Sequence, residues 1–269
     1  MSKNVVAKEF LELQEEIVHL QGTWKHELAS KPVNFNFHKD AVEEGRPLSA
    51  FTDFGIDIPL FLRWIDELNE LLINFKYELR SELTGITNLL SDETVVEWFS
   101  EAFINNYLYF KNFAEEHGIQ EWIPQFLAET VIRPYLYLIA ELVQPEVDRM
   151  KPIECCPVCC EPVRLATLEE EGKKIMHCPR CLAHWHVNRL ACAHCGNEDH
   201  KNIQFLSIEG DAASQIQVCE DCKGYTKIID TRQYITKPSP ALLDVNSIHL
   251  DIIAQDHGYF AVGEKKVIH

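Results

Sequence analysis

The sequence lacks the features that mark membrane-spanning and exported proteins. No run approaches the roughly 18 consecutive apolar residues that a membrane-spanning helix needs. The first residues, MSKNVVAKEFLELQEE, contain no short apolar stretch of the kind found in secretion signals. From these absences we expect a soluble, cytoplasmic protein that does not insert into membranes.

Motifs of common active sites are missing from residues 1–150. This part has no glycine-rich phosphate-binding loop, no His-Glu-x-x-His arrangement and no nucleophile in a recognisable setting. It also contains none of the ten cysteines of the chain. We therefore expect a protein that is not an enzyme and whose distinctive chemistry begins after residue 150.

Positive charge is scarce, with 25 Lys and Arg against 42 Asp and Glu and a net charge of −17. Residues 1–150 hold 12 basic and 26 acidic residues, whereas residues 151–236, which include every cysteine, hold 10 and 12. A nucleic-acid-binding module usually offers a basic face to the phosphates. We therefore expect no nucleic acid among the partners.

What residues 1–150 do contain is apolar residues at helical spacing. The pattern predicts four long helices, at residues 3–29, about 59–79, 91–118 and 122–144. Asp57 is the expected N-cap of the second helix, and the third is expected to run unbroken from Ser91 to Gly118. Pro134 is expected to kink or split the fourth helix, because proline has no backbone N–H. These elements predict an all-α helical bundle.

All ten cysteines lie between residues 155 and 222, and eight of them form four C-x-x-C pairs. The pairs are Cys156/Cys159, Cys178/Cys181, Cys192/Cys195 and Cys219/Cys222. Two pairs supply the four thiolates of one tetrahedral metal site, so four pairs supply two sites. In a cytoplasmic protein this spacing favours metal thiolates over disulfides.

Short runs of strand-like sequence flank the cysteine pairs, and they follow the same plan twice. The runs are Val163–Leu168, Lys173–His177 and Ala183–Asn188, then Ile203–Ile208, Ser214–Val218 and Gly224–Ile229. Sequential pairing gives each site one hairpin and explains this repeat. It assigns Cys156, Cys159, Cys178 and Cys181 to metal site 1, and Cys192, Cys195, Cys219 and Cys222 to metal site 2. The interleaved alternative, first pair with third and second with fourth, leaves the repeat unexplained.

Each half is too short to fold by apolar burial alone, so a metal ion must contribute on the order of 10 kcal/mol per site. A complete four-thiolate shell leaves no position for a substrate, which argues against catalysis by the metal. Zinc and iron both accept this ligand set, and only iron would be redox-active.

Two further cysteines, Cys155 and Cys160, flank the first pair and belong to no C-x-x-C. Three interpretations are open: redox-active thiols outside the metal sites, substitutes for a metal ligand, or incidental small residues, which we prefer. Cys160 stands where a glycine would ease a left-handed turn, as Gly196 does after Cys195.

The predicted fold class is multi-domain, α plus small β. The expected domains are an all-α helical domain at 1–150, a first rubredoxin-like or zinc-ribbon module at 151–190, a second at 191–236, and a C-terminal helix and tail at 237–269.

The residues around the cysteines resemble the formate dehydrogenase accessory protein family, FdhE. The resemblance rests on CPVC at 156–159, CPRC at 178–181, HWHVNRLACAHCGN at 184–197, SIEGD at 207–211 and VCEDCKGYTK at 218–227. It is specific over roughly residues 152–232, and the helical part matches the family mainly in layout. Cys160 departs from the family pattern, in which we expect glycine.

This resemblance implies a cytoplasmic maturation factor for molybdenum- or tungsten-containing formate dehydrogenases, which contacts the catalytic subunit before assembly or export. It also implies iron, with zinc as the alternative, held by the eight C-x-x-C cysteines. Two other functions stay open: a rubredoxin-like one-electron carrier, and a zinc-ribbon nucleic-acid-binding protein, which the charge disfavours.

Overall fold

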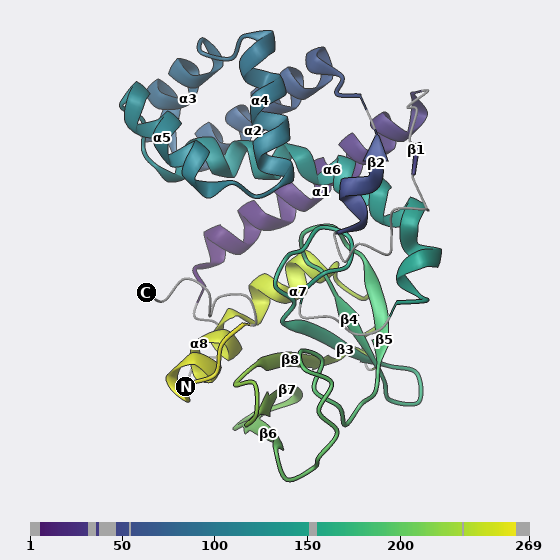
Figure 1. Cartoon of the computed structure of the whole chain (residues 1–269). Helices are drawn as coiled ribbons and strands as arrows, with labels where there is room; N and C mark the ends of the chain where they lie inside the picture. Colours follow the sequence, from purple (N-terminus) through teal and green to yellow (C-terminus); the bar gives the residue numbers. More distant parts are fainter. Residues whose placement is uncertain are drawn as a thin grey trace. The chain divides into compact units, whose positions relative to one another are not determined.

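The computed structural model describes residues 6–31, 36–37, 47–53, 55–150, 155–232 and 234–261 (Figure 1). The chain divides into two compact units. The helical unit comprises Glu12–Phe37 and Thr52–Leu138, and the sheet unit comprises Met1–Leu11, His38–Phe51 and Ile139–His269. The predicted boundaries at residues 150, 190 and 236 stay predictions.

Helices dominate the first part of the chain, as predicted. The elements are α1 (Lys8–Ser30), β1 (Asn36–Phe37), the 3-10 helix η2 (Leu48–Phe51), β2 (Thr52–Asp53), α2 (Ile58–Phe75), the 3-10 helix η3 (Tyr77–Leu79), α3 (Arg80–Thr87), α4 (Asp92–Phe103), α5 (Tyr107–His117) and α6 (Trp122–Val147). The core of the helical unit is aromatic: Trp24 stacks on Trp64 with ring centroids 5.4 Å apart, and Tyr135 meets Trp64 edge-on at 5.9 Å. Among the described residues, no helix combines the length and apolar character needed to cross a membrane.

The caps of the helices follow the sequence signals, with two breaks that the periodicity did not predict. The second predicted helix, about 59–79, ends already at Phe75, and the chain continues as η3 and the unpredicted α3. The Asp57 side chain accepts the Leu60 amide at the start of α2, which confirms the expected N-cap. The predicted helix over 91–118 is wrong, because the chain forms α4 and α5 with a break between them. Asn105 has a left-handed φ of 56°, and the Asn106 side chain caps α5 by accepting the Tyr109 amide.

Pro134 does not split α6, which continues from Trp122 to Val147. A proline within a helix leaves the carbonyl four residues earlier without its usual donor. Here that carbonyl belongs to Thr130, and the buried Gln21 side chain donates to it at 3.0 Å. Gln21 in turn accepts a hydrogen bond from the Tyr137 hydroxyl at 3.0 Å. A polar side chain on the inner face of α1 thus satisfies the group that the proline leaves unbonded.

The two predicted strand triplets form a single six-stranded sheet (Figure 1). The strands are β3 (Leu165–Glu169), β4 (Lys173–His177), β5 (His184–Val187), β6 (Ile203–Ile208), β7 (Asp211–Cys219) and β8 (Tyr225–Asp230), in the order β5-β4-β3-β8-β7-β6. Pairing within each triplet is antiparallel. The triplets join through parallel pairing of β3 with β8, in which Leu165 lies opposite Lys227.

Two short helices, α7 (Pro240–Asn246) and α8 (Ile248–Asp256), pack against this sheet where a single closing helix was expected. Ser239 caps α7, and Ser247 separates the two helices. The shared core contains Leu165, Ile216, Val218, Tyr225, Ile229, Leu243, Leu250, Ala254, Tyr259 and Ala261.

Beside this core, the buried Lys227 of β8 holds both closing helices. Its ammonium lies 2.7 Å from Asp244 of α7 and 2.8 Å from Asp251 of α8. Arg164 adds a second cation 3.0 Å from Asp244. A buried charge of this kind is tolerated because it is paired on several sides.

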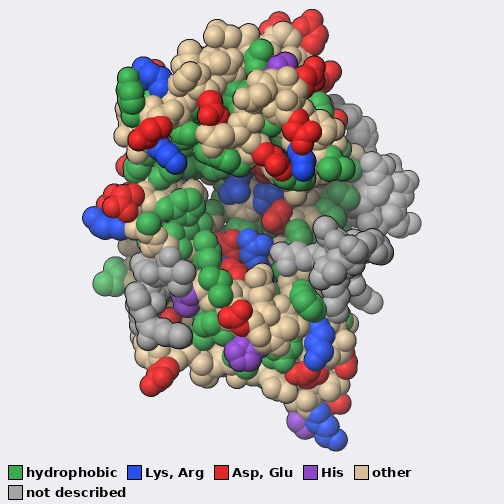
Figure 2. Space-filling view, turned by 90° about the vertical axis from the view of Figure 1, so that its left-hand side faces the viewer, with side chains coloured by type: hydrophobic (Ala, Val, Ile, Leu, Met, Phe, Trp, Pro, Cys, Tyr) green, Lys and Arg blue, Asp and Glu red, His purple; other side chains and the backbone are tan. Residues whose placement is uncertain are grey.

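Charges of both signs are interspersed on the face that Figure 2 shows. Basic side chains form no continuous area among the described residues visible on that face.

Candidate metal centres

Each C-x-x-C pair forms the same tight turn, which we call a knuckle. The backbone amide of the first cysteine donates to the carbonyl of the residue five positions later. The carbonyl of the first cysteine accepts from the amide of the residue four positions later. These two distances are 2.8 and 2.9 Å at Cys156, 2.9 and 2.9 Å at Cys178, 2.8 and 3.1 Å at Cys192, and 3.0 and 2.9 Å at Cys219. The repeated sequence pattern therefore corresponds to four copies of one backbone turn.

Closing this turn requires a left-handed residue directly after the second cysteine of the knuckle. The four residues at this position are Cys160, Leu182, Gly196 and Lys223, with φ values of 61°, 64°, 72° and 58°. Only one of them is glycine, although glycine adopts this conformation at the least cost. The other three accept backbone strain, which shows how strongly the turn is held by its surroundings.

Backbone amides in the knuckles point at the sulfurs. The Val158 amide lies 3.4 Å from the Cys156 sulfur, and the His194 amide lies 3.4 Å from the Cys192 sulfur. Donors in this position favour the thiolate form of cysteine. The knuckle is therefore suited to present negative sulfur ligands.

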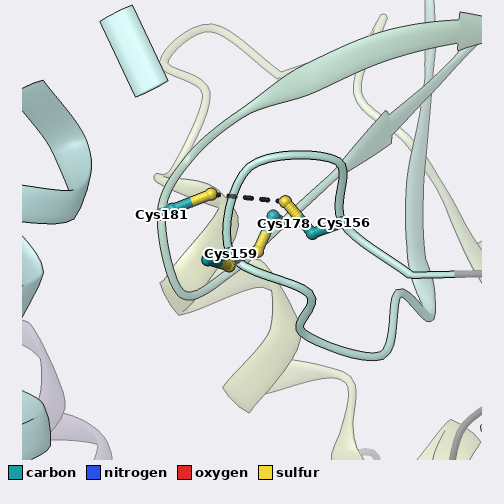
Figure 3. Close-up of side chains that lie close together, drawn as sticks. All are labelled: Cys156, Cys159, Cys178 and Cys181. Atoms are coloured by element: carbon teal, nitrogen blue, oxygen red, sulfur yellow. Dashed lines mark hydrogen bonds between the residues drawn. The ribbon is translucent and has the colours of Figure 1, made fainter. Parts of the chain in front are cut away.

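The knuckles combine in sequence order into two groups of four sulfurs. The first cysteine cluster contains Cys156, Cys159, Cys178 and Cys181, and the second contains Cys192, Cys195, Cys219 and Cys222. In each cluster all four sulfurs lie within 4.8 Å of one another. Figure 3 shows the first cluster, with four side chains converging from two turns. The structure thus groups the cysteines sequentially and not in the interleaved way.

The spacing of the sulfurs fits a tetrahedral metal ion. Metal–sulfur bonds of about 2.3 Å place tetrahedral ligands about 3.8 Å apart. The Cys156–Cys181 and Cys159–Cys178 sulfurs are 3.4 and 3.6 Å apart. In the second cluster, Cys192–Cys222 and Cys195–Cys219 are both 3.7 Å apart. Both clusters therefore have the donor set and the size for one zinc or iron ion each.

Neighbouring thiols lower the pKa of one cysteine in each cluster. Hydrogen bonds from Cys156, Cys178 and Cys181 hold the pKa of Cys159 well below its usual value. In the second cluster, a hydrogen bond from Cys222 is the main cause that lowers the pKa of Cys192 to about 4. Burial raises the pKa of Cys156 and Cys178 in the first cluster and that of Cys195 in the second, so without a cation each cluster favours one thiolate over several.

The two clusters differ in burial. All four cysteines of the first are buried, whereas Cys195 of the second is exposed and Cys222 is half-buried. A segment from much earlier in the chain covers the first knuckle. The Leu48 amide donates to the Pro157 carbonyl at 2.8 Å, and the Ser49 amide donates to the Val158 carbonyl at 3.0 Å.

Sequence reasoning missed Lys174, which links the first half of the sheet to the second cluster. Lys174 lies in β4, is 1% exposed, and donates to the carbonyl of Ala191 at 3.1 Å and to the side chain of Gln217. Burial lowers its pKa to about 8. Strand alternation could have indicated its inward direction, because Lys174 shares a face with the buried Met176.

The remaining predicted site residues, Cys155 and Cys160, lie outside both clusters. Their sulfurs approach each other to 2.9 Å. This places them together as a pair at the base of the first knuckle.

Comparison with known proteins places the chain in one family. The family model described as the FdhE C-terminal domain matches residues 190–267. A protein FdhE homolog of Aquifex aeolicus (strain VF5) is 35% identical over 152 residues, which cover 55% of this chain and 53% of that protein. Protein FdhE of Salmonella enteritidis PT4 is 30% identical over 235 residues, which cover 82% of this chain and 69% of that protein.

The fold agrees with these similarities, although the alignment to the Aquifex protein spans only about half the length of that relative. The crystal structure of the FdhE protein from Pseudomonas aeruginosa matches with a TM-score of 0.58 at 18% identity, over 94% of this chain and 90% of that one. That likeness shows a shared fold. Together with the match to most of the Salmonella protein, it establishes that the chain belongs to the FdhE family.

Proposed function

We propose that this protein is a cytoplasmic accessory factor for formate dehydrogenase maturation, which binds the catalytic subunit before assembly or export. Membership of the FdhE family is the observation that carries this proposal. The two cysteine clusters support it, because each has the four sulfurs with which a metal ion would stabilise a small module.

Each cluster would hold one metal ion through its four sulfurs. Zinc would only stabilise the knuckles, and iron would in addition supply a one-electron couple. The protein's own residues hold the site by fixing the knuckles through backbone hydrogen bonds and by directing the Val158 and His194 amides at sulfur. A complete thiolate shell offers no position for a substrate, so the proposal contains no catalytic step at the metal.

A pull-down combined with metal analysis tests this function. The tagged full-length protein is purified without oxygen from cells that express formate dehydrogenase, and metal is measured on the same sample. We expect the catalytic subunit to co-purify and two metal ions to be present per chain. If intact, metal-loaded protein captures no formate dehydrogenase subunit, the accessory role is contradicted.

A one-electron carrier is the second candidate, and the partial exposure of the second cluster favours it. Electron transfer requires that a redox centre lie close to the surface, which holds for Cys195 and Cys222. This alternative requires iron and a reversible colour change on reduction. A colourless, zinc-filled protein that supports maturation would exclude electron transfer.

A further inference from the structure

Cys155 and Cys160 form a contact that neither metal cluster explains. Their sulfurs lie 2.9 Å apart, closer than the 3.4 to 3.7 Å separations described within the two clusters. Cys160 is exposed and Cys155 is half-buried, so a small molecule in solvent can reach the pair. A disulfide bond is about 2.05 Å long, so the sulfurs need approach by only about 0.9 Å to become bonded.

The knuckle turn explains why these two side chains meet. One precedes the first ligand of the knuckle, the other follows the second ligand, and the turn hydrogen bonds bring its two ends together. The equivalent positions in the other three knuckles hold His177 and Leu182, Ala191 and Gly196, and Val218 and Lys223. Among these four structurally equivalent turns, the first alone carries two thiols at its base.

Cys160 also adopts the left-handed backbone of its turn, as Leu182 and Lys223 do at the equivalent positions. Cys160 has a φ of 61°, a conformation that is unfavourable for any residue with a side chain. The equivalent residue in the third knuckle is Gly196, with a φ of 72°. A glycine would therefore relieve this strain, at the expense of the thiol pair.

We propose that Cys155 and Cys160 form a thiol–disulfide exchange site that reacts with small disulfides such as oxidised glutathione. The exposed Cys160, as thiolate, attacks one glutathione sulfur, forming a mixed disulfide and releasing one glutathione thiolate. The Cys155 thiolate then attacks the Cys160 sulfur, closing the protein disulfide and releasing the second glutathione. Two electrons pass to the glutathione disulfide, and the two thiol protons end on the released glutathione.

This reaction leaves the metal ligands unchanged. The new bond would span the knuckle outside Cys156 and Cys159, so all eight cluster sulfurs stay available to metal. The inference therefore concerns a modification site beyond the proposed function, and it holds whichever metal the clusters bind.

Mass spectrometry of the full-length, metal-loaded protein tests the proposal. The protein is incubated with oxidised glutathione, remaining thiols are blocked, and the linkage is mapped by fragmentation of the peptide that contains residues 155–160. We expect a loss of two hydrogens, a Cys155–Cys160 bond, and unchanged metal content. Reduced glutathione in excess should reverse the change.

The matched control is Cys160→Gly, which places at this position the residue that the third knuckle already uses. It should fold and keep two metal ions, form no internal disulfide, and carry at most one glutathione, on Cys155. Two results would overturn the proposal: a wild-type protein that gains no internal disulfide, or oxidation that instead joins Cys156 to Cys159 and releases metal equally in both proteins. Capture of formate dehydrogenase by Cys160→Gly would leave the proposed function standing in either case.

Discussion

The two cysteine clusters share one turn geometry and differ in their protection from solvent. The first is buried beneath a distant segment whose Leu48 and Ser49 amides bond to its knuckle, whereas the second leaves Cys195 exposed. Coordination geometry is thus set locally by the repeat, and access to the metal is set by long-range packing. We therefore expect two ions with the same ligands and different lability.

The largest expected effect comes from removing one ligand of either cluster. Cys178→Ser should leave one ion per chain, bound in the second cluster, and Cys222→Ser should leave one ion in the first. The half that loses its ion should lose on the order of 10 kcal/mol of folding free energy. Metal analysis and hydrogen exchange of each half measure these losses. Two ions retained in Cys178→Ser would show that this residue is not a ligand.

Lys227→Met tests whether the two halves are stabilised together. The substitution leaves Asp244 and Asp251 buried without their main cation, which should cost about 3 kcal/mol of unfolding free energy in urea. Because β8 borders β3, hydrogen exchange should rise in both halves. Lys223→Met is the control: its half-buried pair with Glu220 lies nearer to solvent and should contribute less than about 1 kcal/mol. A rise confined to the second half would show that the halves unfold independently.

The same salt-bridge cluster predicts a dependence on pH. Burial raises the pKa of Asp244, but Lys227 and Arg164 lower it more, so its folded-state pKa lies below its ordinary value. Asp244 should contribute its full share of the unfolding free energy above about pH 5, where the carboxyl group is ionised in the unfolded chain too. This contribution should be lost as the pH falls through the lowered folded-state pKa. Acid titration of stability should show a larger loss in the wild type than in Asp244→Asn. Equal losses would contradict this assignment.

Competition with a chelator should separate the two ions by rate. We expect the second cluster to release its metal about tenfold faster, a difference worth about 1.4 kcal/mol in the barrier. Leu48→Asp should accelerate release from the first cluster, because it places a charge in the buried cover. The absorbance of the chelator–metal complex follows the two phases of metal release. Cys222→Ser has no metal in the second cluster, so the faster phase should be missing from this variant. A single phase in the wild type would mean that burial does not control lability.

The smallest effect concerns the left-handed residue of each knuckle. Gly196→Ala should lower the unfolding free energy by about 1 kcal/mol, and Cys160→Gly should raise it by a similar amount under reducing conditions. No atom lies within 4 Å of a side-chain carbon built on Gly196, so backbone strain alone is tested there. Urea denaturation of metal-saturated protein measures both. Unchanged stability would show that the turn relaxes to fit either residue.

Local signals in the sequence predicted local structure well. Asp57 is the helix cap that was expected, a helix starts at Ser91 as expected, and the strand runs appear as β3 to β8. The break at Asn105 escaped prediction because the apolar periodicity continues across it and an asparagine can also lie within a helix. Asn105 instead adopts a left-handed backbone conformation, which ends the helix there.

Long-range features could not be predicted from the sequence in the same way. The parallel pairing of β3 with β8 joins residues about 60 positions apart, and strand patterns do not specify such partners. The cover over the first cluster and the path of Lys174 to the Ala191 carbonyl also depend on that arrangement. Sequence spacing therefore predicted which sulfurs could share a metal ion. It did not predict which of the two sites would be buried from solvent.

The strand order has a further consequence for assembly. Across the sheet, the first half appears as β5-β4-β3 and the second as β8-β7-β6, so each half runs from its third strand to its first. The two halves therefore repeat head to tail. The edge strand β5 is the counterpart of β8, and the edge strand β6 is the counterpart of β3. Because β8 and β3 pair at the centre of the sheet, β5 of one copy could pair with β6 of another, and repeated pairing of this kind would give an open filament. Gln144 opposes this by bonding to the backbone of His184 on the β5 edge, and β6 has a register shift between Ser207 and Ile208. A sheet built by repetition thus carries its own protection against polymerisation.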